Sequence, residues 1–517
     1  MDIEPTEALE ALPQVAPSGP PTEICLPTPV MALELDLPAD IAARLSRFPV
    51  IARIKTGRSR THAVTIVWHD TPARDLSESG LALAEQRGAW RLERIRPGPE
   101  PWPPGGPPPA LAQADSLPGL GHDLTQPLLP TVAFEGRALD LILAGEDGPV
   151  ALTLLRGTLR TIGRELAACR LLLSGAEPAV LSLALALAEE AGASVTRASL
   201  AAEALALATG TLPALRRHGA PSVAADATVA DAFAEAVGHL ADVILQLAPA
   251  AADGTDGPET VHHMRVAVRR LRSALTVFRR AVACPAIEAA ELGLKALGAR
   301  LGPTRDWDVF ATETGPRAAA AFPGDKRLER LLAATERRRR AHQAALGAFL
   351  RGPEFRRLGV LLAWIAAGRS WHDSIGEAER EAIAAPLTEF AARVLNRRLK
   401  RVAAAGAGLD GLAPELLHDV RLLAKRLRYA AEIFAPLWPG KATRRFLERL
   451  AALQQELGML NDGAVAAGLL DELAGAGGRQ AFAAGLVLGF VGAGAGGHRA
   501  KIARAWEKFR RQEPFWT

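Results

Sequence analysis

Histidine and arginine side chains that could bind a negatively charged ligand recur in one apolar segment, VHHMRVAVRRLRSALTVF, at residues 261–278. The segment holds four arginines and two histidines but no acidic residue, glycine or proline, a composition that favours a helix. At ~100° per residue, one side of this helix carries a basic row, namely His262, Arg265, Arg269 and Arg272. Basic side chains about 5 Å apart suit a linear polyanion better than one small phosphate.

The same pattern recurs 156 residues later in LHDVRLLAKRLRYAAEIF, residues 417–434. Its basic row consists of His418, Arg421, Lys425 and Arg428. A second pair of matches at this offset is LGPTRDWDV, 301–309, and LGMLNDGAV, 457–465. Two separated matches at one offset indicate a duplication, which predicts an all-α domain of two pseudo-symmetric helical bundles.

An apolar stripe lies beside each basic row and gives each helix a core-facing side. The simplest alternative is that the basic row is a solvated helix face. Two observations argue against it: like charges three and four residues apart weaken a helix, and the same spacing of basic residues recurs in the second segment. The repeat pairs Asp306 with Asp462, and we expect these carboxylates to hold arginines in place rather than to bind a metal. Three positions on other helices complete the candidate set of anion-binding residues: Arg397, Arg401 and Arg444.

Charge is distributed unevenly along the 517 residues, although the net charge is only +4. Residues 1–224 contain 19 Lys and Arg against 25 Asp and Glu, whereas residues 225–517 contain 42 against 32. The second part is therefore the candidate for binding an anionic partner. Three widely spaced cysteines indicate neither a disulfide framework nor a zinc site.

The order of sequence patterns predicts an α+β half followed by an all-α half. Residues 1–27 are acidic and contain proline without an apolar core, which predicts a disordered tail and no signal peptide. Short strand-like runs dominate 28–213, and beyond a boundary near 209–226 only helical patterns remain. No uninterrupted apolar run is long enough to span a membrane, so we expect a soluble, cytoplasmic protein.

The repeated segments resemble the CHAD domain, the conserved histidine α-helical domain, over about residues 225–510. The resemblance implies a CHAD domain at 222–512, with repeat halves at about 222–377 and 378–512. It also implies two four-helix bundles around a basic groove or pore that binds inorganic polyphosphate. The family's basic positions correspond to the residues of the two rows, and its histidines correspond to His262 and His418.

Residues 28–213 resemble, more faintly, the CYTH or triphosphate tunnel family, for example in HDTPARDLSESGLAL. This implies an antiparallel β-barrel or tunnel, but the catalytic signature is degenerate. The family's EXEXK strand corresponds to Ala32, Glu34 and Asp36, and a later acidic strand reads RLLL at 170–173. Hydrolysis of triphosphate in this fold requires carboxylates that hold a divalent metal. Because most of these carboxylates are missing here, we predict no metal, no cofactor and no catalytic residues.

Three functions follow from these observations. The first is inorganic polyphosphate binding without chemistry, in a protein that associates with polyphosphate or storage granules and their proteins. The second is a metal-dependent inorganic triphosphatase of the CYTH class, against which the missing acids argue. The third is nucleic-acid binding, which is disfavoured because the basic segments lack interleaved aromatic residues for base stacking.

Overall fold

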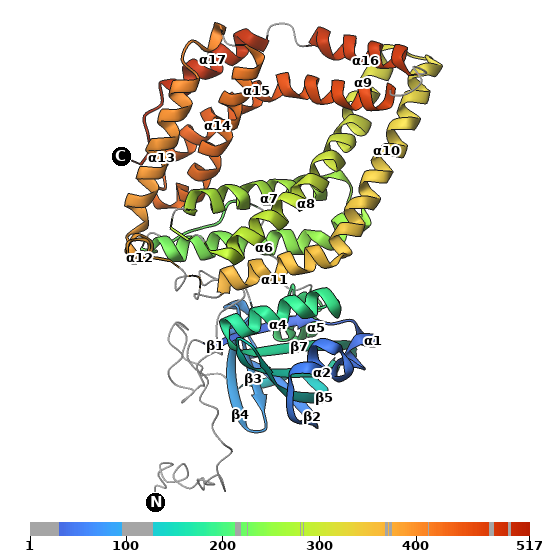
Figure 1. The fold of residues 1–517 in the computed structure, drawn as a ribbon, viewed down its shortest axis with the longest axis vertical. Coiled ribbons are helices and arrows are strands. Elements are labelled where there is room, and N and C mark those ends of the chain that lie inside the picture. The colour runs from blue at the N-terminus through green and yellow to red at the C-terminus, as the bar shows by residue number, and fades with distance from the viewer. Residues whose placement is uncertain are drawn as a thin grey trace, which may run out of the picture.

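The structure is a computed structural model, and it describes a large part of the chain. The described residues are 30–95, 128–211, 219–224, 226–279, 281–282, 284–367, 371, 375–411, 413–474, 480–494 and 498–516. The predicted tail, residues 1–27, lies outside them. No helix in the described part is long and apolar enough to cross a lipid bilayer. The elements form a sheet half followed by a helical half, as predicted (Figure 1).

The sheet half contains one antiparallel sheet with the strand order β4-β3-β2-β5-β6-β7-β1-β8. The strands are β1 (Val30–Asp36), β2 (Lys55–Asp70), β3 (Leu81–Gln86), β4 (Ala89–Arg94), β5 (Leu129–Gly145), β6 (Gly148–Thr161), β7 (Arg164–Ala176) and β8 (Ser194–Val195). The predicted antiparallel sheet is confirmed. Among the described residues the edge strands β4 and β8 do not pair, so the sheet is open rather than a closed barrel.

Both faces of the sheet are covered by helices. The helices of this half are α1 (Ala39–Ala42), α2 (Pro49–Ile54), α3 (Asp75–Glu78), α4 (Glu177–Glu190) and α5 (Leu200–Thr209), with a 3-10 turn η1 (Leu45–Arg47). Successive side chains of a strand point to opposite faces. Leu33 and Leu35 therefore join the core under α4, whereas Glu34 points to the opposite face and accepts a hydrogen bond from the backbone of α5.

The described residues of the second half form helices and short helical turns (Figure 1). They are α6 (Val229–Asp253), α7 (Pro258–Phe278), α8 (Pro285–Val309), α9 (Gly315–Ala321), α10 (Lys326–Arg351), α11 (Pro353–Ala367), α12 (Glu377–Ala384), α13 (Leu387–Ala405), α14 (Pro414–Phe434), α15 (Lys441–Ala474), α16 (Ala481–Gly494) and α17 (His498–Arg510). Short elements join them, namely a π-helical turn η2 (Phe310–Thr314) and the 3-10 turns η4 (Leu409–Gly411) and η5 (Ala435–Leu437).

The helix boundaries follow the sequence repeat. α7 and α14 each start at a proline in the first turn, a position that suits proline, and their bounds differ by 156 residues at both ends. α8 and α15 also begin 156 residues apart. The long helix α10 corresponds to the shorter pair α16 and α17, and α11 has no helical counterpart in the described part of the second copy. Two pseudo-symmetric bundles, as predicted, result from this repeat.

Aromatic packing fixes α7 against α14. Phe278 and Phe434 occupy equivalent positions in the two copies, and their ring centroids lie 6.1 Å apart. Phe390 of α13 stacks on Phe278 at 5.4 Å. A continuous apolar core extends from the sheet half through both bundles. Because α7 and α14 share this core, the basic rows that they carry are held in a defined relation to each other.

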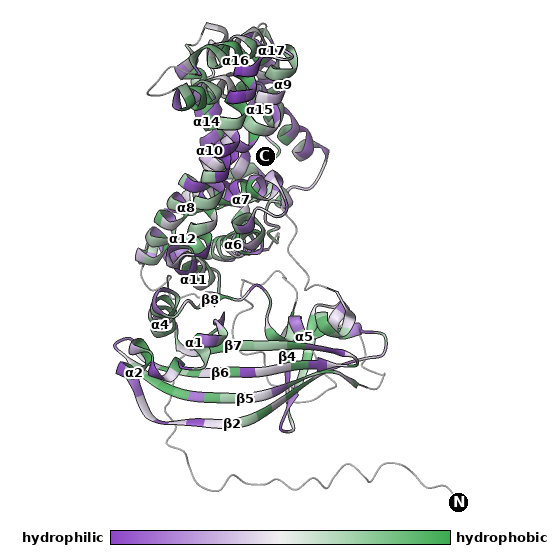
Figure 2. Cartoon of the chain, turned by 90° about the vertical axis from the view of Figure 1, so that its right-hand side faces the viewer, coloured by the Kyte–Doolittle hydropathy of each residue, from purple (hydrophilic) through white to green (hydrophobic). Residues whose placement is uncertain are grey.

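The two halves of the chain pack through α4 and α11, which lie between the sheet and the bundles in Figure 2. Arg356 of α11 donates a hydrogen bond from Nε to the carbonyl oxygen of Ala188, 2.8 Å away. Gly359 of α11 leaves room for Leu245 of α6, whose side chain would lie 3.3 Å from a Cβ at that position. The first bundle therefore carries the sheet half on its outer face.

Candidate anion-binding surface

The predicted basic row of α7, here called the α7 row, consists of His262, Arg265, Arg269 and Arg272. The first three side chains are half-buried, and Arg272 at the end of the row is exposed. The opposite side of α7 is buried in the core through Met264, Val268 and Leu271. The amphipathic pattern of the segment thus places the row at the edge of the core, where guanidinium groups keep access to solvent.

Two glycines of α8 make room for the arginines of the α7 row. A Cβ at Gly302 would lie 3.0 Å from Nη1 of Arg265, and one at Gly298 would lie 3.8 Å from Nη1 of Arg272. The two glycines are four residues apart and so share one face of α8. A side chain at 302 would crowd the guanidinium group of Arg265, whereas a Cβ at 298 would only reach van der Waals contact with Arg272.

Asp306 of α8 lies beside the α7 row, with Oδ1 3.8 Å from Nη1 of Arg265. Burial lowers the pKa of Arg265, and the attraction to Asp306 opposes that shift. Burial likewise raises the pKa of Asp306, against the attraction of Arg265 and Arg305. The distance fits the predicted supporting role of Asp306, which stays a prediction, and one carboxylate leaves most of the charge of the row uncompensated.

The α14 row consists of His418, Arg421, Lys425 and Arg428. His418 is exposed and the other three side chains are half-buried. Arg428 donates from Nη1 to Oε1 of Gln454 at 3.3 Å, and Gln454 is the repeat equivalent of Gly298. Asp462 belongs to α15, but its side chain lies outside the described part of the structure. Its supporting role therefore also stays a prediction.

The two rows approach each other at Tyr429, the single tyrosine of the chain. The guanidinium carbon of Arg269 in α7 lies 5.5 Å from the ring centroid of Tyr429 in α14. A cation over an aromatic face is attracted to the ring quadrupole, so this contact joins the α7 row to α14 at Arg269.

Arg270 does not belong to the α7 row and instead forms an ion pair with α14. Its Nη2 lies 2.9 Å from Oε2 of Glu432 in α14, and Nε donates to the same oxygen at 3.0 Å. The other oxygen of Glu432 accepts from Nε of Arg428 at 2.7 Å. Arg270 and Glu432 are both largely buried. This ion pair ties the two pseudo-symmetric helices together directly below the rows.

His262 occupies a positively charged environment at the start of the α7 row. Burial lowers its pKa, and the nearby charge of Arg305 lowers it further, while Glu259 acts in the opposite direction. In the protein without a ligand, His262 therefore gains its positive charge at a lower pH than an unperturbed histidine does. A bound anion would reverse this shift, because it would favour the imidazolium form.

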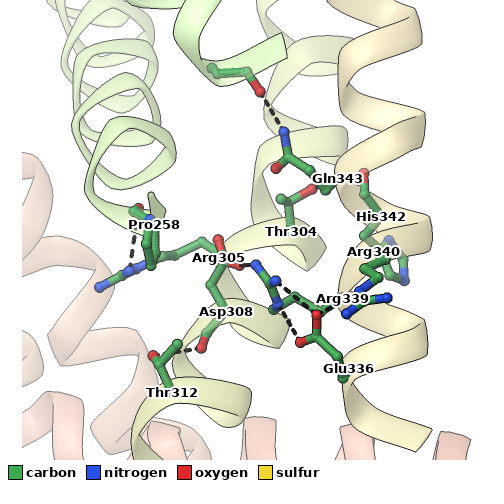
Figure 3. A network of polar contacts seen from close by, with 11 residues as sticks. Pro258, Thr304, Arg305, Asp308, Thr312, Glu336, Arg339, Arg340, His342 and Gln343 are labelled. Carbon is green, nitrogen blue, oxygen red and sulfur yellow. Dashed lines mark hydrogen bonds and ion pairs between the residues drawn. The ribbon is translucent and has the colours of Figure 1, made fainter. Parts of the chain in front are cut away.

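A polar network joins the start of α7 and the end of α8 to the middle of α10 (Figure 3). Arg305 of α8 donates to the carbonyl oxygen of Pro258, 3.4 Å away. Arg339 of α10 contacts Asp308 at 3.4 Å and Glu336 at 2.7 Å. Hydrogen bonds from Arg339 lower the pKa of Glu336 to about 2. The network fixes the part of α8 that carries Asp306, next to the α7 row.

The remaining candidates lie elsewhere. Arg397 and Arg401 are exposed on α13, where they neighbour Arg398. Arg444 lines a cavity of about 770 Å³ together with Arg270 and Glu432. The structure thus brings the α7 row and the α14 row together but places these three arginines outside them.

The sheet half uses its surviving acids in an ion cluster around the buried Arg170. Arg170 of β7 lies 3.1 Å from Glu34, 2.9 Å from Asp36 and 2.5 Å from Glu203 of α5. Glu34 also accepts a hydrogen bond from the backbone N–H of Leu200 at 2.9 Å. Burial raises the pKa of Asp36 and of Glu203, and the attraction of Arg170 opposes this. The described residues contain no group of three or more His, Cys, Asp or Glu side chains arranged to hold a metal ion.

Comparison with known proteins identifies the helical half. The family model of the CHAD domain matches residues 235–471. The crystal structure of the CHAD domain from the plant Ricinus communis is 31% identical, covers 58% of this chain and 98% of its own, and has a TM-score of 0.51. The chain belongs to the CHAD family. Both basic rows lie within the matched residues of its CHAD domain.

Two other solved structures are more distantly similar. PptA from Streptomyces chartreusis is 17% identical over 56% of this chain and 100% of its own, with a TM-score of 0.41. The putative adenylyl cyclase HpAC1 from Hippeastrum, described as having a dominant triphosphatase activity, is 16% identical over 35% of this chain and 97% of its own, with a TM-score of 0.25. These scores are too low to carry an inference about function. A comparison with curated protein sequences finds no match.

Proposed function

We propose that this protein binds inorganic polyphosphate on its CHAD domain, through the α7 row and the α14 row, without catalysing a reaction. One observation carries the proposal: two repeat-related cationic rows approach each other at the contact between Arg269 and Tyr429. A linear polyanion with one charge at short, regular intervals can contact several guanidinium groups at once. A single small phosphate could use only one or two of them.

The charge balance around the rows supports this proposal. Asp306 lies 3.8 Å from Arg265 of the α7 row, and Glu432 binds Arg428 of the α14 row but is shared with Arg270. Rows of like charge are unfavourable in the absence of a ligand, and a bound polyanion would offset the repulsion. Arg397, Arg401 and Arg444 lie outside the rows, and their predicted part in binding stays a proposal.

We further propose the division of the chain that the sequence indicates, with a CYTH-like domain at 28–213 and the CHAD domain at 222–512. The CYTH-like domain serves as a scaffold docked on α11 rather than as a triphosphatase. The pairing of Glu34 and Asp36 with Arg170 supports this, because the carboxylates needed for a metal already hold a cation. In the cell, we expect the protein in the cytoplasm, on polyphosphate or storage granules.

The test is binding of long-chain polyphosphate to the full chain and to the variant Arg265→Ala with Arg421→Ala. We expect affinity at low salt to fall by at least tenfold, since about two charge-assisted contacts are lost. A control with equal charge loss is Arg58→Ala with Arg60→Ala, because both are exposed on β2. Unchanged affinity in the row variant would contradict the proposal, and stronger competition by DNA than by polyphosphate at fixed salt would favour nucleic acid as the ligand.

A further inference from the structure

Four arginines form a second cationic group beside α14, here called the α13 cluster. Its members are Arg397, Arg398 and Arg401 of α13 and Arg426 of α14. Nη1 of Arg398 donates a hydrogen bond to the carbonyl oxygen of Arg426. Arg398 is half-buried, whereas the other three side chains are exposed. The hydrogen bond fixes one guanidinium group between the two helices, with three more around it.

The electrostatics of the α13 cluster are unfavourable in the absence of a ligand. Burial, followed by the charges of Arg426, Arg397 and Arg401, lowers the pKa of Arg398 to about 10, and no carboxylate opposes these causes. The acidic residue of α13, Glu389, lies at the start of the helix and pairs with Arg393 at 3.6 Å. Such an accumulation of like charge costs stability unless an anion neutralises it.

The sequence repeat shows that this face of the bundle is used differently in the first copy. The positions equivalent to Arg397, Arg398 and Arg401 are Ala241, Asp242 and Leu245, all of which are buried. There, α11 covers α6, since a Cβ at Gly359 would lie 3.3 Å from Leu245. In the second copy all three equivalent positions are basic, and Arg397 and Arg401 are exposed.

The α13 cluster lies close to the α14 row across the surface of one helix. Lys425 of the row and Arg426 of the cluster are adjacent in sequence, so their side chains project ~100° apart around α14. On a helix about 10–12 Å in diameter, this corresponds to a path of about 10 Å. The buried side of α14, which includes Ala424 and Leu427, lies on the other side of the helix. A chain bound at the row can therefore reach the cluster over the solvent-facing side of α14.

We propose that the α13 cluster is a second contact for the polyphosphate chain held by the α14 row, so that the CHAD domain binds long chains more tightly than short ones. The inference rests on the proposed polyphosphate binding and adds a length dependence to it. A short oligophosphate is held at the rows alone. A longer chain continues around α14 and neutralises the cluster. The long chain is then bound more tightly, because it occupies two linked sites at once.

The test compares long-chain polyphosphate with tripolyphosphate on the full chain and on Arg397→Gln with Arg401→Gln. This variant leaves the hydrogen-bonded Arg398 in place, and its two positions are exposed, so the fold is retained. We expect the affinity for long chains to fall about three- to tenfold and the slope of log K against log salt to decrease in magnitude by about 1.4. The affinity for tripolyphosphate stays unchanged. The matched control is Arg58→Gln with Arg60→Gln.

Two results would overturn this inference alone: an unchanged affinity for long chains, or an equal loss for both chain lengths. If the unmodified protein bound no polyphosphate of either length, the proposed function itself would fail, and the second contact with it.

Discussion

Two arginines, one in each half of this protein, have opposite surroundings. Arg170 of the sheet half has a side chain only 8% exposed and contacts three carboxylates. Arg265 of the helical half is 31% exposed and has one carboxylate at 3.8 Å. Around Arg170 the carboxylates outnumber the cation and neutralise its charge within the fold. Around Arg265 the cations outnumber the acid, so charge remains for a ligand. The local balance of charge, more than arginine content, separates a structural site from a binding surface.

The largest effect that tests this comparison is expected for Arg170→Met. The substitution keeps an apolar stem but leaves Glu34, Asp36 and Glu203 without their cation, and we expect the free energy of unfolding at pH 7 to fall by about 3 kcal/mol. Burial already raises the pKa of Asp36 and Glu203. The folded state therefore binds more protons than the unfolded state, and the loss should shrink as the pH falls toward 4.5.

Chemical denaturation at several pH values measures this loss. The exposed Arg58→Met is the control and should change the free energy of unfolding by less than about 0.5 kcal/mol. An equal effect of both substitutions would show that the ion cluster of the sheet half does not hold α5 in place.

Glu432→Gln should give an intermediate effect with opposite signs for stability and binding. Arg270 loses its carboxylate in a largely buried place, so we expect the free energy of unfolding to fall by about 1–3 kcal/mol. Arg428 is released from the same carboxylate, so the affinity for polyphosphate at low salt should rise two- to threefold. Denaturation and polyphosphate titration measure the two quantities.

Arg270→Met is the paired control for this prediction. It should lower stability in a similar way but should not raise affinity, since it removes a cation and leaves Glu432 bound to Arg428. If Glu432→Gln and Arg270→Met changed affinity equally, the distinction between Arg270 and the rows would be wrong.

The smallest effect concerns His262, whose pKa is lowered by burial and by Arg305. Without ligand, the unfolded state binds the proton more tightly, so this residue costs stability as the pH falls below 6.5. A bound polyanion should raise the pKa, and affinity should therefore increase by about two- to threefold between pH 7.5 and 5.5. NMR titration of the imidazole with and without polyphosphate checks this, with His262→Gln as the control. An identical titration in both states would place His262 outside the binding surface.

Much of the helix arrangement in the helical half could be predicted because the duplication is still detectable in the sequence. The offset of 156 residues between the two basic segments matches the offset between the bounds of α7 and α14. Helical periodicity then separated the core-facing residues from the basic rows. The direction of Arg270 on the helix is enough to separate it from the rows. Its pairing with Glu432 could not be predicted, because pairing across helices depends on tertiary packing.

The residues that the sequence did not reveal are those whose roles depend on long-range contacts. Tyr429 was visible as the single tyrosine, yet its position under Arg269 depends on the crossing of α7 and α14. The sequence places Arg170 in a degenerate strand, and only the register of β7 against β1 places it opposite Asp36. The sequence indicates Arg397 and Arg401 but not Arg398, although the half-buried guanidinium of Arg398 is the one that links α13 to α14.

The most direct test of the central claim is the salt dependence of polyphosphate binding to the full chain. The rows contain six arginine and lysine side chains, so at ~0.7 released counterions per contact the slope of log K against log salt should be about −4. In Arg265→Ala with Arg421→Ala the slope should decrease in magnitude by about 1.4. A slope near zero for the unmodified protein, or the same slope in both proteins, would contradict the claim that the α7 row and the α14 row bind the chain.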